Sequence, residues 1–218
     1  DLFSTFCLTC TSLTRLYFSA KKFRIQLMAK APSAKIAPYR LLGVDPGTTL
    51  LGFAIIEIDG TKLRMLEMGV IHLNKLPSHE ERLQRIFERI TQVISIHKPR
   101  EMAIEAPFYG KNVQVMLKLG RAQGVAMAAG LARDLAIIEY SPRKIKQAIT
   151  GNGNASKEQV AAMLKTLLKF TEKPEFLDAT DGLAVAVCHA FQRNDAGDSG
   201  KSYSGWAAFA KANEKRIS

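Results

Sequence analysis

The alternation of apolar and polar residues from Arg40 onward predicts an α/β domain. Short apolar runs separated by turn signals such as PGTT after Asp45 and Asp59-Gly60 are typical of strands and hairpins. Strands are predicted at residues 40–45, 51–58, 62–73, 101–107 and 135–140. Since the first three read as antiparallel neighbours and the last two alternate with helices, we expect a five-stranded mixed sheet flanked by helices.

Apolar residues spaced three and four apart predict the helices. They are expected at residues 78–98, 111–133, 142–149, from 156 onward and 177–193. Ser156 with Gln159 fits a capping box at the start of the fourth helix. The Gly- and Ala-rich stretch 120–130 fits either a core helix or the contact of a dimer, and the sequence leaves both open.

The two ends of the chain differ from its centre. Residues 1–38 are rich in Ser, Thr, Phe and Lys with poor periodicity, so we expect a disordered or non-native extension. Residues 39–193 form the predicted domain, and the polar residues 194–218 a flexible tail. Cys7-x-x-Cys10 lacks a second ligand pair, so it is read as chance rather than a zinc site.

The charge of the chain narrows its partners. Lysine and arginine outnumber aspartate and glutamate by 31 to 20, and the pI is near 9.7. This balance favours a polyanion, with nucleic acid ahead of an anionic membrane. The sequence contains no run of about 18 apolar residues, so no membrane-spanning helix is expected. Three cysteines are too few for a disulfide framework, which suits a reducing, cytoplasmic compartment.

Four acidic residues stand where predicted elements begin or end. Asp45 ends the first strand and Glu105 lies near the end of the fourth, so neighbouring strands would raise both from one end of the sheet. Asp178 and Asp181 are three residues apart at the start of the last helix and share a face. Singly, Asp45 also fits turn chemistry and Asp178 a helix cap. Together they predict two metal ions about 4 Å apart, because the cluster would otherwise repel itself. Oxygen ligands favour Mg²⁺, with Mn²⁺ as the alternative.

Five ordered motifs resemble one family. They are LGVDPGTTLLGFAII, AIEAPFYGKNVQ, LKLGRAQGVA, SPRKIKQAITGNGNASKEQV and DATDGLAVAVCHA. Together they resemble the RuvC-type Holliday-junction resolvases over roughly residues 40–192. The resemblance implies a ribonuclease H-like fold and a homodimer that cuts four-way DNA junctions. It implies that Asp45, Glu105, Asp178 and Asp181 are the catalytic, metal-binding residues. Gly182 stands where an alanine is common in the family.

The resemblance also points to residues that contact DNA. Phe108 is expected to stack on or wedge between bases at the crossover, although an aromatic residue here also fits packing under its own loop. Lys146 and Lys157 are placed near the scissile phosphate, and Lys157 lies in the first turn of a helix. Weaker candidates for backbone contacts are Lys111, Arg143, Arg121 and Lys144.

We therefore predict a metal-dependent endodeoxyribonuclease that resolves four-way junctions by paired phosphodiester hydrolysis during recombination and repair. By resemblance, a branch-migration complex of RuvA and RuvB type is an expected partner. GVDPGTT alone also fits an actin-like or sugar-kinase ATPase, but those folds need a second phosphate loop. Two further hypotheses are a non-catalytic junction-binding module and a related nuclease-like housekeeping protein.

Overall fold

The computed structural model describes residues 37–107, 112–170 and 177–197. Its strands are β1 (Tyr39–Asp45), β2 (Leu50–Asp59), β3 (Lys62–His72), β4 (Glu101–Glu105) and β5 (Ala136–Tyr140). Its helices are α2 (His79–His97), α3 (Val113–Leu131), α4 (Pro142–Thr150), α5 (Lys157–Leu168) and α6 (Leu177–Gly197). The predicted order of helices and strands is confirmed. The predicted limits of the domain remain a prediction, because residues 1–36 and 198–218 lie outside the described residues.

The strands form one mixed sheet in the order β3-β2-β1-β4-β5. β1, β2 and β3 pair antiparallel, whereas β4 pairs parallel with both β1 and β5. The predicted fold class is therefore confirmed. Because β1 and β4 are parallel neighbours, their C-terminal residues Asp45 and Glu105 come out at the same edge of the sheet.

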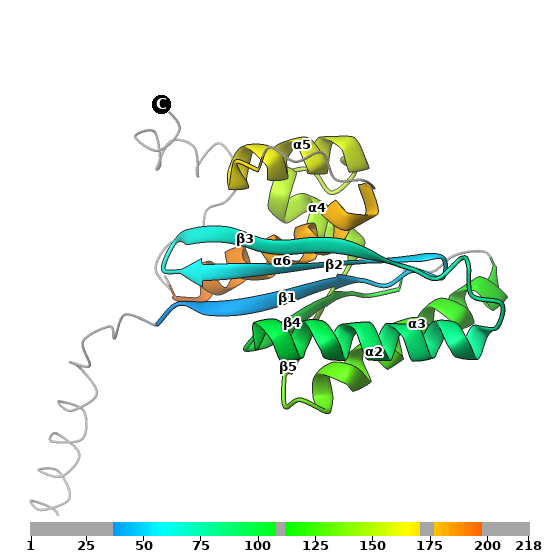
Figure 1. Ribbon diagram of the computed structural model, residues 1–218. Helices are drawn as coiled ribbons and strands as arrows, with labels where there is room; N and C mark the ends of the chain where they lie inside the picture. Colours follow the sequence, from blue (N-terminus) through cyan, green and yellow to red (C-terminus); the bar gives the residue numbers. More distant parts are fainter. Residues whose placement is uncertain (1–36, 108–111, 171–176, 198–218) are drawn as a thin grey trace, which may run out of the picture. The chain divides into compact units, whose positions relative to one another are not determined.

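Helices cover both faces of the sheet. In Figure 1, α2 and α3 lie on one side and α4, α5 and α6 on the other. Strand residues alternate between the two cores: Leu41 packs with the α4–α6 side, and Leu42 with the α2–α3 side. The same alternation along β4 sends Ala103 towards the α4–α6 side and Ile104 to the other.

Local signals fix several helix ends. Ser156 and Gln159 form the predicted capping box at the start of α5. The helix expected from residue 111 begins at Val113, because the Asn112 side chain accepts hydrogen bonds from the backbone amides of residues 114 and 115. Among the described helices, none is both long and apolar enough to cross a bilayer.

Candidate active site

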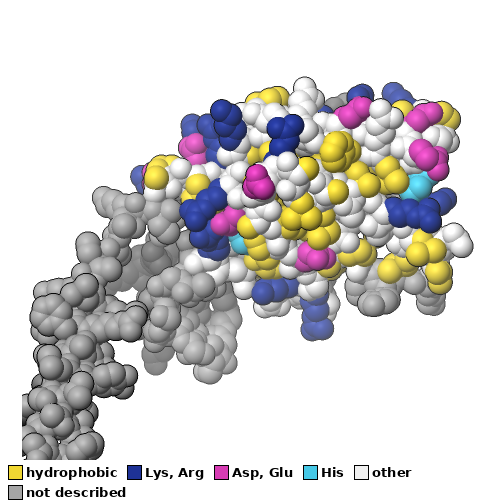
Figure 2. Space-filling model, turned by 90° about the horizontal axis from the view of Figure 1, so that it is seen from below, with side chains coloured by type: hydrophobic (Ala, Val, Ile, Leu, Met, Phe, Trp, Pro, Cys, Tyr) yellow, Lys and Arg dark blue, Asp and Glu magenta, His cyan; other side chains and the backbone are white. Residues whose placement is uncertain are grey.

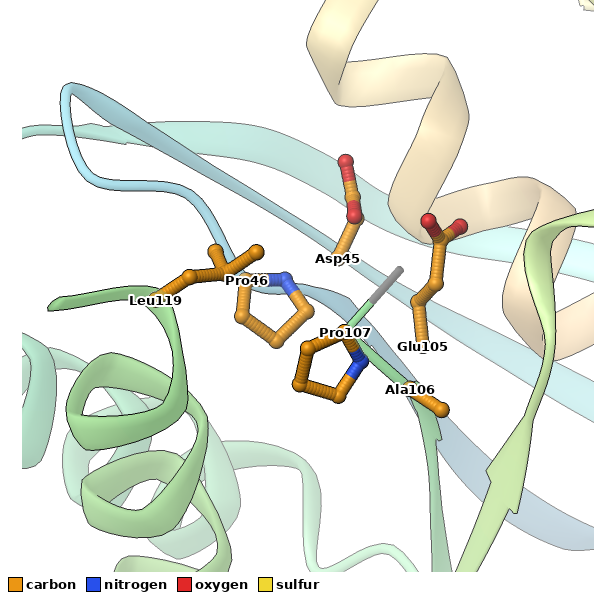
Figure 3. A pocket seen from close by; sticks show the side chains of 6 residues that line it. All are labelled: Asp45, Pro46, Glu105, Ala106, Pro107 and Leu119. Carbon is orange, nitrogen blue, oxygen red and sulfur yellow. The ribbon is translucent and has the colours of Figure 1, made fainter. Parts of the chain in front are cut away.

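Two strand ends place Asp45 and Glu105 side by side. Since Leu41 and Ala103 face the α4–α6 side, the period-2 alternation of a strand sends Asp45 and Glu105 to that side too. Figure 3 shows the two carboxylates rising next to each other from adjacent strands. The predicted neighbourhood of these two residues is therefore what the fold produces.

Helix α6 reaches these strands through close glycine contacts. Gly52 pairs directly with Asp45 across β1 and β2, and a Cβ there would lie 2.0 Å from the backbone oxygen of Asp178. A Cβ at Gly43 would lie 2.2 Å from the backbone oxygen of Gly182, and one at Gly182 would lie 2.7 Å from the backbone of Phe53. Only residues without a side chain allow this approach, which brings the first turns of α6 onto the sheet beside Asp45.

The acidic side chains lie close enough for their charges to shift one another's pKa values. Burial, and then the charges of Glu105 and Asp181, raise the pKa of Asp45 well above its ordinary value. Burial and then the charge of Asp181 raise the pKa of Glu105 to about 7, although Lys157 and Lys146 oppose the shift. Burial also raises the pKa of Asp181. The four predicted carboxylates therefore form one interacting cluster with too little positive charge.

Lys157 supplies part of the missing charge. Its ammonium group donates hydrogen bonds to Asp178 Oδ1 at 3.1 Å and Asp181 Oδ2 at 2.5 Å. Burial alone would lower the pKa of Lys157, but these two carboxylates raise it above its ordinary value. Lys146 lines the same cavity of about 200 Å³, together with Asp45, Glu105 and Asp181.

The donor chemistry of the cluster fits a hard divalent cation. Buried carboxylate oxygens that repel one another are the ligands that Mg²⁺ and similar ions prefer. Within residues 37–107, 112–170 and 177–197, however, no group of three or more acidic, His or Cys side chains already has the spacing of a metal site. In this arrangement, Lys157 occupies hydrogen-bonding positions on Asp178 and Asp181. The residues thus fit the ion in chemistry, and ligation requires their side chains to rearrange.

The other predicted DNA contacts lie at different places. Lys144 sits 5.4 Å from the ring centre of Tyr140, a cation–π distance. Arg143 on α4 is exposed and packs against Gly153, while Arg121 is exposed on α3. None of these three lines the cavity that holds Lys146 and Lys157. Phe108 and Lys111 lie outside the described residues.

The sequence missed a polar support behind Glu105. Buried Gln123 of α3 donates to the backbone oxygen of Glu105 at 3.4 Å and to Glu139 Oε2 at 2.8 Å. The only available signal was one amide within a Gly- and Ala-rich helix. The contact anchors the end of β4 from the face opposite the carboxylates.

A second polar group lies deep in the α4–α6 core. His189 Nδ1 is 2.8 Å from the Tyr140 hydroxyl, and its Nε2 is 2.9 Å from Glu101 Oε2. Arg193 donates to the other oxygen of Glu101. His189, about two helical turns beyond Asp181 in α6, thus bonds to Tyr140 and Glu101 and not to the acidic cluster.

Comparisons with known sequences find a family and relatives that share one description. The family described as crossover junction endodeoxyribonuclease RuvC matches residues 41–189. A protein of that name from Cytophaga hutchinsonii is 55% identical over 190 residues, covering 87% of this chain and 94% of its own length. The Porphyromonas gingivalis protein of the same name is 56% identical over 182 residues, covering 81% and 96%.

Solved structures give the same result. Thermus thermophilus RuvC in complex with a Holliday junction substrate is 31% identical, with a TM-score of 0.68, covering 72% of this chain and 96% of that one. The yeast mitochondrial Holliday junction resolvase is 13% identical with a TM-score of 0.57, covering 76% and 86%, a likeness of fold alone.

Proposed function

Because the chain belongs to the RuvC family of crossover junction endodeoxyribonucleases, we propose that it resolves four-way DNA junctions by paired, metal-dependent hydrolysis of phosphodiesters. The observation that carries the proposal is the convergence of Asp45 and Glu105 with the first turns of α6. All four predicted carboxylates are present, which disfavours a non-catalytic binding module. The basic composition of the chain suits a DNA substrate.

The proposed ligands are Asp45, Glu105, Asp178 and Asp181, with two Mg²⁺ ions as the preferred pair and Mn²⁺ as the alternative. Bound ions would supply an activated water and stabilise the leaving oxygen of the phosphodiester. The four carboxylate side chains would hold these ions and help to orient the phosphodiester beside them. A carboxylate replaced by its amide keeps the shape but loses the charge that this role needs.

Two lysines complete the proposed site. Lys146 and Lys157 line the cavity that Asp45 and Glu105 open into. They can offset the negative charge that builds on the scissile phosphate. Lys157 first has to leave Asp178 and Asp181, so its pairing with them and its contact with phosphate are alternatives. By resemblance, Phe108 is proposed to wedge into the crossover, and Lys111 and Arg143 to contact the backbone.

A second copy of the chain is the proposed partner for paired cuts. An outward stripe on α3, here called the α3 stripe, comprises Val113, Leu117, Gly120, Gly124, Ala128 and Leu131. Val113, Leu117 and Leu131 are 66%, 51% and 60% exposed, and no described neighbour approaches either glycine. Figure 2 shows hydrophobic side chains gathered on this face of the molecule. Such a stripe suits a helix that packs on its own two-fold copy, because small residues let two backbones come close.

The cytoplasmic location and the contact with a branch-migration complex of RuvA and RuvB type remain proposals that rest on the family resemblance. The family assignment disfavours the ATPase hypothesis. A metal-dependent ATP hydrolysis assay on the purified protein tests that hypothesis directly.

The decisive experiment compares nicking of a synthetic four-way junction and a linear duplex, each with and without Mg²⁺. We expect symmetric cuts only in the junction and only with the ion. Asp178→Asn should bind the junction as the wild type does and fail to cut it. Full cutting by this variant in Mg²⁺ would contradict the proposed ligand set.

The dimer is tested separately. Gly124→Arg should place a charged side chain in the α3 stripe, yield a monomer by light scattering and uncouple the paired cuts. Met163→Arg, at a 39% exposed apolar residue of α5, is the matched control and should stay dimeric. A dimeric Gly124→Arg protein would move the contact elsewhere.

A further inference from the structure

Helix α6 meets the sheet through two different kinds of contact. Against β1 and β2, backbone packs on backbone at Gly43, Gly52 and Gly182. Such packing limits how closely the helix can approach, but van der Waals contact has no preferred direction and does little to stop small slides or rotations. A hydrogen bond weakens steeply when its distance or angle changes. The contacts of α6 with β4 and β5 are of this directional kind.

A buried chain of hydrogen bonds ties α6 to both of these strands. The Tyr140 hydroxyl is 2.8 Å from His189 Nδ1, and His189 Nε2 is 2.9 Å from Glu101 Oε2. The three residues are only 7%, 4% and 8% exposed in that order. Glu101 is a carboxylate that also accepts from Arg193. His189 Nε2–H therefore donates to Glu101, and Nδ1 is left to accept from the Tyr140 hydroxyl.

Tyr140 joins this chain to the strand that carries Glu105. It is the last residue of β5 and pairs with Glu105 in the parallel register of β4 and β5. Its backbone oxygen accepts from the N–H group of Ala106, the residue after Glu105, at 2.9 Å. One residue therefore holds the end of β4 through its backbone and α6 through its hydroxyl.

His189 passes this constraint to the acidic residues of α6. It lies two turns beyond Asp181 in the same helix, about 12 Å along the axis at 1.5 Å per residue. A helix is stiff over such a length, so a shift or rotation at His189 reaches Asp181 with little loss. Without the Tyr140 hydroxyl, the buried Nδ1 would lack its donor, and movement of the helix is the way to relieve this. The spacing between Asp181 and Glu105 therefore depends on a contact outside the acidic cluster.

We propose that the hydrogen bond between Tyr140 and His189 is the positioning contact that holds Asp178 and Asp181 against Glu105 at the spacing a divalent ion needs. Neither residue touches the ion or the DNA, and both act through the carboxylates. The inference rests on the ligand set of the proposed function and deepens it. Mg²⁺ reports on such positioning well, because it demands near-ideal octahedral geometry.

Two substitutions at His189 separate the two halves of the chain. In His189→Asn, the amide oxygen takes the place of Nδ1 and can still accept from Tyr140, whereas the bond to Glu101 is lost. In His189→Gln, the amide nitrogen takes the place of Nε2 and can still donate to Glu101, whereas the bond to Tyr140 is lost. A residue that served stability alone would make these two variants alike, and a positioning bond at Tyr140 makes them differ.

Two tyrosine variants complete the set. Tyr140→Phe removes the same bond from its other side and keeps the ring that Lys144 contacts at 5.4 Å. Tyr39→Phe is the matched control, because it also removes one hydroxyl and keeps a ring that Arg193 contacts at 5.3 Å. The double variant Tyr140→Phe/His189→Gln tests whether both changes remove one bond, in which case their effects should not add.

Ion affinity is measured on the full-length protein without DNA, from the rise in Tm as Mg²⁺ is added. Cleavage is measured in parallel, as single-turnover rates on a synthetic four-way junction across the same Mg²⁺ range. Tyr140→Phe and His189→Gln should each need about 10 times more Mg²⁺ for half of the effect in both assays, the size typical of lost support behind a metal ligand. Their affinity for the junction should not change. His189→Asn and Tyr39→Phe should stay close to the wild type, and the double variant should be no worse than either single one.

Unchanged Mg²⁺ affinity in Tyr140→Phe would overturn the inference, as would an equal loss of affinity in His189→Asn and His189→Gln. If the His189 variants do not fold, the comparison of Tyr140→Phe with Tyr39→Phe decides. Wild-type protein that binds Mg²⁺ but does not cut the junction would refute the proposed function alone, because ion affinity is read without DNA. Wild-type protein whose Tm does not respond to Mg²⁺ would overturn the inference itself.

Discussion

Gly52→Ala tests whether the contact between β2 and α6 positions the acidic cluster. The added Cβ would lie 2.0 Å from the backbone oxygen of Asp178, about 1.4 Å short of the 3.4 Å at which ordinary contact begins. The obstacle is backbone on both sides, so no side-chain rotation relieves it. The start of α6, with Asp178 and Asp181, therefore has to retreat from Asp45 by about an ångström.

This displacement should harm activity more than stability. A shift of about 1 Å in reacting groups can cost roughly 10²-fold in rate. Overpacking by one methyl group costs about 1–3 kcal/mol of unfolding free energy. For a domain of this size that corresponds to a fall in Tm of about 3–9 °C. We therefore expect a folded protein that cuts junctions about 100 times more slowly.

Gly69→Ala is the matched control. Gly69 pairs with Phe53 in the same sheet, but its Cβ would meet only the far end of the Phe53 ring, at 3.1 Å. It should lose some stability and keep its cleavage rate. Rates are measured on a synthetic junction with protein in excess, and Tm by thermal unfolding. A Gly52→Ala protein with wild-type rate and Tm would show that α6 does not depend on this contact.

Three further variants test the charges of the site and its surroundings. Asp181→Asn should remove most of the rise in Tm that Mg²⁺ or Mn²⁺ gives the wild type, and an unchanged rise would exclude Asp181 as a ligand. Lys157→Met should lower Tm in the absence of divalent ions. Its Tm should rise more than that of the wild type when the ions are added, since an ion replaces the lost charge beside Asp178 and Asp181. An equal rise in the two proteins would argue against the ion and Lys157 using the same position. For Glu101, burial favours a raised pKa, but hydrogen bonds from Arg193 and His189 outweigh it and lower the pKa. Its stabilising effect is therefore complete above the ordinary carboxyl pKa and lost as pH falls below it, so the Tm gap between wild type and Glu101→Gln should shrink between pH 5.5 and 3.5, and a constant gap would contradict the assignment.

The fold was predictable because its signals are local. Alternation within strands, the Asp59-Gly60 turn and the Ser156 cap each depend on residues close in sequence. Asp45 and Glu105 were predictable for the same reason: each ends an apolar run, and the strand period decides which face it takes.

The close packing of α6 on the sheet was not predictable, because it depends on glycines that are far apart in the sequence and come into contact only in the fold. Gly43 and Gly52 read as ordinary strand residues in the sequence, and Gly182 as a small departure from the family pattern. In the structure they are the points at which helix and sheet backbones touch. The pairing of Lys157 with Asp178 and Asp181 was not predictable for the same reason. A lysine at the start of a helix predicts a contact with phosphate, and only the fold brings the two carboxylates within reach.

The acidic cluster couples stability to cation binding. A carboxyl group whose pKa is higher in the folded chain than in the unfolded chain lowers stability once pH exceeds the unfolded value. Asp45, Glu105 and Asp181 are all shifted in this direction. Burial of the apolar cores on the two faces of the sheet offsets this loss of stability, and the positive charge of Lys157 reduces it. A divalent cation that binds to the cluster relieves the same repulsion between carboxylates. Its binding should therefore raise the free energy of unfolding and release Lys157 to contact a phosphate.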